Sequence, residues 1–271
     1  MTATTAPTPR TLPVKIPHGP RVAIHDAVSI TNRNLIGWRR VPQLLVFSTI
    51  QPVIFVLLFR YVFGGAINVP GIPYVDYLMP GVWAQAVTFG AVSTAIGLSS
   101  DLTTGLLERF RSLPMARSAV MVGRTTADLV RNVFVVILMA IVGFLVGFEY
   151  HTNFLGLLAG LGMIVLFGYA LSWVFAIVGL TVRDPEAAQA AAFPVIALLV
   201  FASSAFVPIS TMPGWLQAYA YHQPLTATVD ASRALVLGGP TAHDVIAALA
   251  WDAGILAVAA PLAVWLYRRA S

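Results

Sequence analysis

One short stretch of the chain, residues 103–118 (TTGLLERFRSLPMARS), concentrates side chains that can form ion pairs. Glu108, Arg109, Arg111 and Arg117 fall within ten residues of a chain in which only 27 of 271 residues are charged. Carboxylate and guanidinium groups at this spacing can pair with one another or with a partner, and a pair enclosed by protein is costly to leave unmatched. The stretch is therefore the first candidate for a contact with another molecule.

The spacing within this stretch predicts a short amphipathic helix. Glu108 and Arg111 lie three residues apart on the side that faces water, and Pro114 favours a helix end at about Leu113. A helix this short would hardly hold alone in water, so its apolar side needs lipid or a protein partner. A lipid anchor explains the arginines well but explains Glu108 poorly. The apolar side consists of Leu106, Leu107, Phe110 and Leu113.

Other reactive patterns are scarce in the sequence. The chain has a single lysine, Lys15, without a Gly-rich loop before it, so there is no G-x-x-x-x-G-K-S/T phosphate cradle and the chain is not itself an ATPase of that type. There is no H-E-x-x-H zinc helix and no G-x-S-x-G nucleophile elbow. The five histidines lack metal-ligand spacing and cysteine is absent, so we expect no catalytic residues and no metal site.

Asp252 is the one acidic residue clearly within an apolar segment. It can be a polar group in a substrate path or a partner for Arg60, or else an aspartate that reaches water at the outer headgroups. One such acid is thin support for proton coupling, which commonly uses acidic or histidine relays inside the membrane. If the chain is part of a transporter, we therefore expect the energy to come from another chain.

The composition indicates a polytopic helical membrane protein. Apolar residues make up 58% of the chain, the mean hydropathy is +0.82, and 10% of residues are charged, against about a quarter in a water-soluble domain. The apolar runs have membrane-spanning length and do not alternate as the strands of a β-barrel do. In such a protein a formal charge of +5 reflects cytoplasmic loops rather than a nucleic-acid site.

Six membrane-spanning helices are expected. Residues 1–20 contain five prolines and no apolar core, which predicts a disordered cytoplasmic tail rather than a signal peptide. Residues 22–42 predict a helix in the headgroup region, with Trp38 as an anchor. Pro52 and Pro194 lie inside spans, where they can kink a helix without ending it. The spans are expected at about 44–63, 78–100, 129–148, 154–182, 191–208 and 245–267.

The basic residues orient the chain. If the N-terminus is cytoplasmic, 13 of the 16 Lys and Arg residues fall in inner segments, and the outer loops 64–77 and 149–153 have none. This bias places both termini and the charged stretch in the cytoplasm. Arg60 and Arg131 lie near span ends, where a long side chain can reach the interface.

A proline-rich segment, residues 206–239, separates the last two expected spans. Its prolines break it too often for one helix, while Trp215, Tyr219 and Tyr221 suit a membrane interface. These features predict a re-entrant or interfacial hairpin that roofs an outward cavity; an ordinary aromatic headgroup belt is the alternative. The prolines are Pro208, Pro213 and Pro224.

Two stretches, in their joint order and spacing, resemble the permease subunits of ABC-2-type exporters, particularly the daunorubicin/doxorubicin-resistance-like branch. TGLLERFRSLPMARSAVMVGR has the charged-then-proline pattern of that family's loop between spans 2 and 3. FVPISTMPGWLQAYAYHQPLTATVDASRALVLGG is similar to its outer segment between spans 5 and 6. The resemblance covers nearly the whole chain from about residue 21, which implies one transmembrane domain at residues 21–271.

The resemblance implies an all-α integral membrane fold: six transmembrane helices, an N-terminal interfacial helix, a cytoplasmic coupling helix between spans 2 and 3, and an outer hairpin between spans 5 and 6. In that family the coupling helix docks on a separate ATP-binding subunit, so ATP and Mg²⁺ are expected there and no cofactor on this chain. The implied coupling residues are Leu107, Glu108, Arg109, Phe110, Arg111, Leu113 and Pro114. The implied outer-gate residues are Pro208, Pro213, Trp215, Pro224, Leu225, Thr226, Asp230 and Arg233.

The function implied is the membrane half of an ATP-driven exporter in the cell membrane. Two permease subunits, identical or paralogous, would join two ATP-binding subunits and move hydrophobic drugs, polyketide-like compounds or lipids across the bilayer; no nucleic acid is expected. A polysaccharide or lipid-linked glycan exporter of the same fold is one alternative. An ion-coupled multidrug carrier and a membrane-embedded enzyme or scaffold are others, and only Asp252 favours the carrier.

Epitope tags test the orientation. Tags at the N-terminus, at residue 110 and at the C-terminus should be cytoplasmic, and a tag near residue 70 should be external, because the basic residues gather on one side. Antibody access to each tag in intact and in permeabilised cells measures this. An external tag at residue 110 would contradict both the topology and the coupling role.

Overall fold

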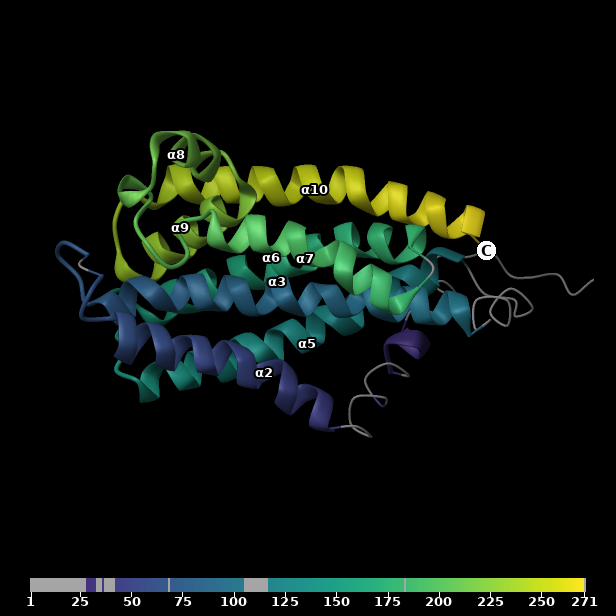
Figure 1. Cartoon of the computed structure of the whole chain (residues 1–271), viewed down its shortest axis with the longest axis horizontal. Coiled ribbons are helices and arrows are strands. Elements are labelled where there is room, and N and C mark those ends of the chain that lie inside the picture. Colours follow the sequence, from purple (N-terminus) through teal and green to yellow (C-terminus); the bar gives the residue numbers. More distant parts are fainter. Residues whose placement is uncertain are drawn as a thin grey trace, which may run out of the picture.

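The structure, a computed structural model, describes residues 28–32, 36, 42–67, 69–104, 117–182 and 184–270. Every regular element within these ranges is a helix, and the long helices run side by side along one axis (Figure 1). The elements are α2 (Pro42–Leu57), the π-helical η1 (Leu58–Phe63), α3 (Tyr74–Thr103), α5 (Arg117–Leu145), α6 (Phe154–Thr181), α7 (Pro185–Phe201), the 3₁₀ turn η2 (Ile209–Thr211), α8 (Gly214–Tyr221), α9 (Pro224–Leu237) and α10 (Thr241–Ala270).

Four of the described helices are long and apolar enough to cross a membrane: α3, α5 from Val120 onward, α6 and α10. Two shorter apolar helices accompany them, Thr49–Phe63 in α2 and η1, and Pro185–Phe201, which is α7. The prediction of an all-helical membrane protein is therefore confirmed for the described residues, with four clear candidate spans.

The helix that contains most of the third expected span, at about 129–148, begins before that span. Helix α5 starts at Arg117, so part of the expected loop before it is helical. Arg124 pairs there with Asp101 at the end of α3, and this pairing lets two charged residues lie on packed helices instead of in a loop.

The helix at the fifth expected span, about 191–208, is α7, which begins before that span and ends within it. Asp184 caps α7 by accepting a hydrogen bond from the Ala187 backbone N–H at 2.7 Å, and Pro185 suits the first turn because it has no N–H to satisfy. The helix ends at Phe201, so the residues that follow it are not part of a regular span.

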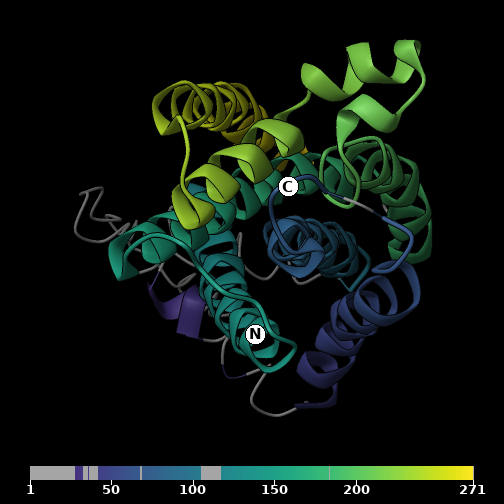
Figure 2. The same ribbon diagram turned by 90° about the vertical axis from the view of Figure 1, so that its left-hand side faces the viewer.

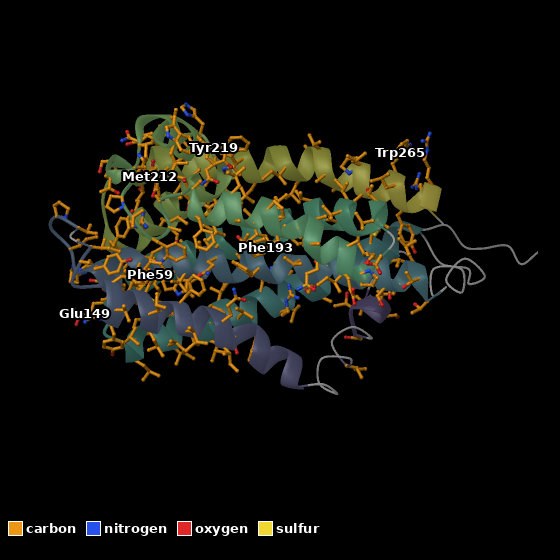
Figure 3. All side chains as sticks on the ribbon, in the orientation of Figure 1. Phe59, Glu149, Phe193, Met212, Tyr219 and Trp265 are labelled. Carbon is orange, nitrogen blue, oxygen red and sulfur yellow. The ribbon has the colours of Figure 1, made fainter. Side chains whose placement is uncertain are left out.

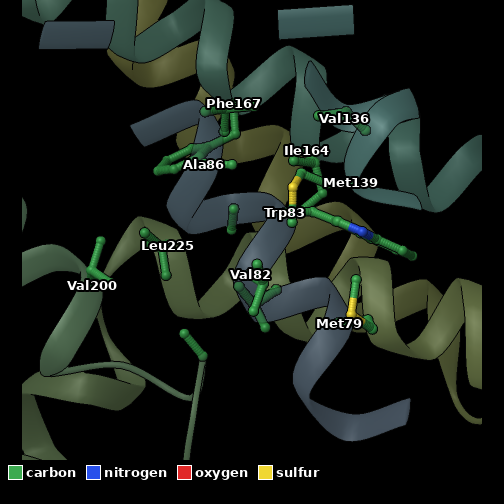
Figure 4. Packing of buried hydrophobic residues seen from close by; sticks show 14 of the residues in the cluster. Met79, Val82, Trp83, Ala86, Val136, Met139, Ile164, Phe167, Val200 and Leu225 are labelled. Atoms are coloured by element: carbon green, nitrogen blue, oxygen red, sulfur yellow. The ribbon is translucent and has the colours of Figure 1, made fainter. Parts of the chain in front are cut away.

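Helix α3 occupies the centre of the bundle (Figure 2). Twenty of its thirty residues are buried, and it contacts α2, α5, α6, α7 and α9. Trp83 is fully buried and meets the Phe148 ring edge-on, with 5.3 Å between ring centroids. Met79, Met139 and Phe167 lie in the same cluster (Figure 4). Because lipid is as apolar as these side chains, close packing rather than escape from water holds such helices together.

One end of the bundle, which we call the hairpin end, carries α8, α9 and the connection between α5 and α6. Asp76, in the first turn of α3, is only 1% exposed; it accepts a hydrogen bond from the Glu149 N–H at 2.9 Å and lies 3.0 Å from His151 Nε2. The His151 N–H donates to the carbonyl of Val236 in α9 at 3.0 Å. The connection thus ties α3 to α9.

The helix expected at residues 22–42 is described only in part, at residues 28–32, residue 36 and Pro42. Ile30 is buried in a cluster with Met121 at the end of the bundle opposite the hairpin end. Thr31 Oγ1 donates to the Gly123 carbonyl at 3.0 Å. The described turn therefore contacts the start of α5.

Gly81 lets the chain after α7 lie directly against α3. A Cβ at this position would overlap the backbone carbonyl of Ala205. We expect Gly81→Ala to lower the free energy of unfolding by about 1–3 kcal/mol, because backbone atoms on both sides would have to move apart. Thermal unfolding of the purified protein in detergent measures the change.

Gly254→Ala in α10 is the matched control. A Cβ there meets nothing within 4 Å, and alanine is the better helix former, so this variant should be neutral or slightly stabilised. Equal melting temperatures for the two variants would show that the close approach at Gly81 has no energetic role.

Candidate functional site

The chain after α7 leaves the helix while it is still enclosed by protein. Residues 202–206 form turns and bends, yet all five are buried, and Ala205 is fully inaccessible. In an apolar interior each backbone carbonyl needs a donor, and a broken helix no longer provides one. The segment therefore depends on side-chain donors from its neighbours.

Two tyrosines at the start of α3 provide such donors. The Tyr77 hydroxyl donates to the Ser204 carbonyl at 3.0 Å, and the Tyr74 hydroxyl donates to the Phe206 carbonyl at 2.9 Å. Both bonds join residues far apart in the sequence, so they fix the irregular segment to the central helix.

The start of α9 satisfies further groups of this segment. Gln223 Nε2 donates to the Ala202 carbonyl, and the Ser204 N–H donates to Thr226 Oγ1 at 3.3 Å. These bonds place the beginning of α9 beside the end of α7.

Arg233 joins all three parts. Its Nη2 donates to the Ser204 carbonyl at 3.0 Å and to the Tyr77 carbonyl at 3.1 Å, and its Nη1 donates to Asp230 Oδ1 at 2.7 Å. The guanidinium carbon also lies 3.7 Å from the centre of the Tyr77 ring, within cation–π distance. One side chain therefore contacts α3, the irregular segment and its own helix α9.

We call this group the hairpin cluster: Tyr74, Tyr77, Ser204, Thr226, Asp230 and Arg233. The Ser204 hydroxyl donates to Asp230 Oδ1 at 2.8 Å, so this carboxylate accepts from both a hydroxyl and a guanidinium. Burial raises the pKa of the Asp230 carboxyl above its usual range, while Arg233 and the Ser204 hydrogen bond act in the opposite direction. The cluster is thus a charged network in which the removal of one side chain would leave its neighbours without a hydrogen-bond or ion-pair partner.

Helix α9 packs against α6, α10 and α3, and two glycines of α6 permit this close packing. A Cβ on Gly156 of α6 would lie 2.6 Å from the Leu235 carbonyl, and one on Gly160 would lie 2.5 Å from the Val236 side chain. This G-x-x-x-G spacing on α6 therefore allows α9 to approach its backbone. Pro224 occupies the first turn of α9, where its missing N–H costs nothing.

The segment expected to form the outer hairpin contains α8 and α9, and the predicted gate residues separate into two sets. Pro224, Leu225, Thr226, Asp230 and Arg233 all lie on α9, close to the irregular segment. Pro208 and Pro213 precede η2 and α8, and Trp215 is 76% exposed. Met212 and Tyr219 lie with them at the hairpin end (Figure 3). Whether these residues act as a gate stays a prediction.

The seven expected coupling residues lie outside the described residues, which stop at residue 104 and resume at residue 117. Their assignment to a coupling helix stays a prediction. It concerns Leu107, Glu108, Arg109, Phe110, Arg111, Leu113 and Pro114.

Asp252 and Arg60 are not brought together. Arg60 lies in η1, at the end of α2, and α2 and α10 occupy opposite sides of the bundle (Figure 2). Asp252 is only 1% exposed, and neither carboxylate oxygen has a hydrogen-bond partner among the described residues. The structure therefore gives no support to an Arg60 pair or to an aspartate that reaches water.

A cavity of about 420 Å³ lies among α2, α3, α5 and α7. Its polar lining comes from Gln51, Ser93, Arg131 and Gln189, and the rest is mostly apolar. Phe193 lies on this cavity and is placed about midway along the bundle (Figure 3). No residue of the hairpin lines it, so the expectation that the hairpin roofs a cavity does not apply to this one.

Arg131 is the charged residue among the described residues that line this cavity, and it is buried, so the structure gives no support to a side chain that reaches the membrane interface. Because α5 starts at Arg117, Arg131 lies about 21 Å along the helix, where it is 8% exposed. Its guanidinium donates to Ser93 Oγ and to the Gly90 carbonyl of α3, while Asp128 of its own helix is 3.7 Å away.

The sequence does contain a signal for this buried pair. Asp128 and Arg131 are opposite charges three residues apart, the spacing of a helical ion pair. Asp128 also accepts a hydrogen bond from the Thr94 hydroxyl of α3. The signal was missed because Asp128 was assigned to a loop.

These features define a multi-pass helical membrane protein in which buried polar side chains connect the helices. Within the described residues, no group of three or more His, Cys, Asp or Glu side chains could hold a metal ion. The chain belongs to the ABC-2 type transporter family, whose model matches residues 26–237. The resemblance inferred from the two sequence stretches is thereby confirmed.

Three relatives have names that specify resistance transporters. The chain is 35% identical over 254 residues to the daunorubicin resistance ABC transporter permease protein DrrB1 of Streptomyces coeruleorubidus, with 92% of this chain and 90% of that protein covered. It is 28% identical over 276 residues to the probable doxorubicin resistance ABC transporter permease protein DrrC of Mycobacterium tuberculosis, with 100% and 99% covered. It is 27% identical to DrrB of the same organism over 83% of this chain and 80% of that one.

The hairpin cluster yields a prediction for Arg233→Gln. Losing the guanidinium leaves the Ser204 and Tyr77 carbonyls short of donors and Asp230 without a cation, so the free energy of unfolding should fall by about 2–3 kcal/mol. The deficit relative to the parent should be largest above the pKa of Asp230 and should shrink as the pH falls through it, because a protonated carboxyl needs no cation.

Thermal unfolding in detergent at a series of pH values measures both effects. Arg268→Gln, which removes the same charge from an exposed position in the last turn of α10, is the control and should have little effect. A deficit that stays constant over the pH series would contradict the role of Asp230 as the partner.

Proposed function

We propose that this chain is the membrane-spanning permease subunit of an ATP-driven ABC exporter, which moves a hydrophobic drug-like, polyketide or lipid substrate out of the cytoplasm or the inner leaflet. The observation that carries the proposal is the match with a daunorubicin resistance permease over 92% of this chain and 90% of that protein. A match over nearly the full length of both chains concerns the whole helical bundle and not a single motif.

ATP hydrolysis takes place on a separate subunit in this proposal. The sequence has no phosphate-binding loop, so the ATP-binding partner holds ATP and Mg²⁺. Two permease subunits, identical or paralogous, and two ATP-binding subunits form the complete exporter in the plasma membrane. The many large apolar side chains on the bundle surface, such as Phe134, Phe193 and Ile246, suit contact with lipid or with a second permease subunit.

Six spans, with both termini in the cytoplasm, are the topology that we propose. The two shorter helices complete the count: α2 and η1 are continuous from Pro42 to Phe63, and α7 is followed by the buried segment 202–206. Irregular backbone at membrane depth is tolerated where protein encloses it and satisfies its polar groups, as the hairpin cluster does here. The transmembrane domain is then residues 21–271, preceded by a cytoplasmic tail.

The charged stretch between α3 and α5 is the proposed joint with the ATP-binding subunit. It connects the end of the central helix α3 to α5, so a displacement of the stretch would be transmitted to the helix that contacts most of the others. At the other end of α3, the hairpin cluster would couple the same displacement to the hairpin, through Tyr74 and Tyr77.

An ion-coupled carrier is the second candidate, and one observation favours it. Asp252 is a buried acid without a hydrogen-bond partner in the described part of the chain, and buried acids inside spans are typical of proton relays. A polysaccharide or lipid-linked glycan exporter has the same architecture and differs only in its substrate.

Charge reversal at Glu108 tests the coupling role. If the stretch enters a cleft of the ATP-binding subunit, Glu108→Lys should weaken substrate-stimulated ATPase activity and export, since an enclosed charge pair left unmatched costs about 2–5 kcal/mol. A lipid anchor would instead be unharmed or helped by another positive charge beside anionic headgroups. The measurements are ATPase activity and export by the assembled complex, with membrane insertion checked in parallel.

Two controls accompany this experiment. Phe110→Asp should also uncouple the complex by disrupting the apolar side of the same stretch, and the permease alone should show no ATP hydrolysis. Normal coupling in both variants would mean that this loop is not the joint. Export driven by an imposed proton gradient without ATP, and lost in Asp252→Asn, would favour the carrier instead.

A further inference from the structure

Charged and polar side chains join α3 to α5 along the part of their interface that lies near the charged stretch. Arg124 of α5 pairs with Asp101 of α3, two residues before α3 ends at Thr103. About one turn further into the bundle, Asp128 of α5 accepts a hydrogen bond from the Thr94 hydroxyl of α3 at 2.5 Å. We call these contacts the α3–α5 ladder: Asp101 with Arg124, Thr94 with Asp128, and Arg131 with Ser93 and Gly90.

The outermost contact of the ladder is fitted to one geometry. A Cβ at position 97 of α3 would overlap the Arg124 guanidinium, so Gly97 leaves the space in which this side chain reaches Asp101. The Arg124 and Asp101 side chains are 18% and 23% exposed, so protein covers most of both. A charge pair that is mostly removed from water interacts more strongly than a pair on an open surface. Gly97 therefore fits this point of α3 to a guanidinium from α5.

The ladder also fixes the register of the two helices. Along α5 the order is Arg124, Asp128 and Arg131, and their partners on α3 follow in the reverse direction, as antiparallel helices require. A displacement of one helix along the other by one turn, about 5.4 Å, would separate these partners. The two helices therefore cannot slide past each other while the ladder is intact.

The outermost pair of the ladder lies close to the two helix ends that the charged stretch connects. Helix α3 ends at Thr103, whereas α5 begins at Arg117, so about 10 Å of α5 extends beyond Arg124 toward the stretch. A force on the stretch reaches the bundle through these two ends. The deeper ladder contacts and the packing of Met79 against Gly143 hold the helices together elsewhere, so the outermost pair can be broken without separating them.

We propose that Arg124 and Asp101 are positioning residues of the exporter, whose ion pair makes the ends of α3 and α5 move as one unit when the charged stretch is displaced. With the pair intact, ATP-driven displacement of the stretch moves the central helix α3 together with α5. Without the pair, the two ends move separately and part of the displacement is absorbed between them. This proposal rests on the exporter function and on the coupling role proposed for the stretch, and it identifies residues of the described bundle that transmit the displacement.

Spin labels at the two helix ends can test this proposal, because the chain contains no cysteine and labels attach only where one is introduced. Thr103 of α3 and Val122 of α5 are exposed, and double electron–electron resonance between labels at these positions measures the separation of the ends. The measurements use the assembled complex without nucleotide and the complex trapped with ATP, Mg²⁺ and vanadate. In the parent the separation should be the same in both states.

Gly97→Ala is the decisive variant, because it displaces the Arg124 guanidinium from Asp101 without removing a charge. Alanine is also the better helix former, so the change does not weaken α3 itself. In this variant the separation should differ between the two states by a shift of up to about one helical turn, 5.4 Å. Gly162→Ala on α6, where a Cβ meets nothing within 4 Å, is the matched control and should behave as the parent does.

Two further variants distinguish a positioning role from a general loosening of the bundle. Arg124→Gln should give the same shift as Gly97→Ala, and the two changes together should give no larger shift, because both act through one guanidinium. Arg124→Lys should restore the parent behaviour in the Gly97→Ala background, because the ammonium keeps the charge and lacks the second guanidinium nitrogen that a Cβ at position 97 would overlap.

A separation in Gly97→Ala that is the same in both states, as in the parent, would overturn the proposal. So would additive shifts from Gly97→Ala and Arg124→Gln. The exporter function is judged separately, by ATP-dependent export in the parent complex. A parent complex that exports, with no shift in Gly97→Ala, would retain the function and lose the positioning role. A shift in Gly97→Ala in a complex that does not export would do the reverse.

Discussion

The hydrogen-bonding demand of one short piece of backbone determines how this end of the molecule is built. Residues 202–206 leave the helix within the protein interior, where water cannot satisfy their carbonyls. The tyrosines of α3 and the polar residues of α9 supply the donors, so the central helix, the end of α7 and the hairpin cannot be placed independently. Gly81 on α3 and the two glycines on α6 remove side chains where these backbones meet.

Buried polar side chains inside the bundle also require hydrogen-bond or ion-pair partners. Arg131, Asp128 and Thr94 are polar residues on the α3–α5 interface, and each has a partner on the facing helix or nearby. In lipid, apolar packing alone discriminates poorly between neighbouring helices, and polar contacts of this kind fix which helices meet and in what register. The same arginine lines the cavity among α2, α3, α5 and α7, so a contact that orders the fold also places a polar side chain on that cavity.

Several properties of this molecule can be predicted from the sequence because they depend on composition and local spacing. The apolar runs predict membrane helices, and the prolines at 208, 213 and 224 predict that this segment is not one helix, which agrees with the short elements η2, α8 and α9. Helix ends were less predictable. The expected span 129–148 leaves Asp128 in a loop, because its charge is visible in the sequence whereas the Thr94 hydroxyl that it accepts comes from another helix. The end of α7 depends likewise on donors such as Tyr77 and Arg233, which lie over a hundred residues apart in the chain. The burial of Asp252 depends on how the helices pack and could not be predicted from the sequence.

The central position of α3 also determines how the subunit can deform. Together with α6, α9 and α10 it forms a block joined by close backbone contacts and by the Asp76 and Arg233 bonds. Helix α2 contacts only α3, α5 and its own extension η1 among the strong helix pairs, and much of its described surface is exposed. The cavity lies along the seam between this peripheral helix, α7 and the block. Rigid-body rocking across that seam would change the volume of the cavity without disturbing the bonds that hold the block together.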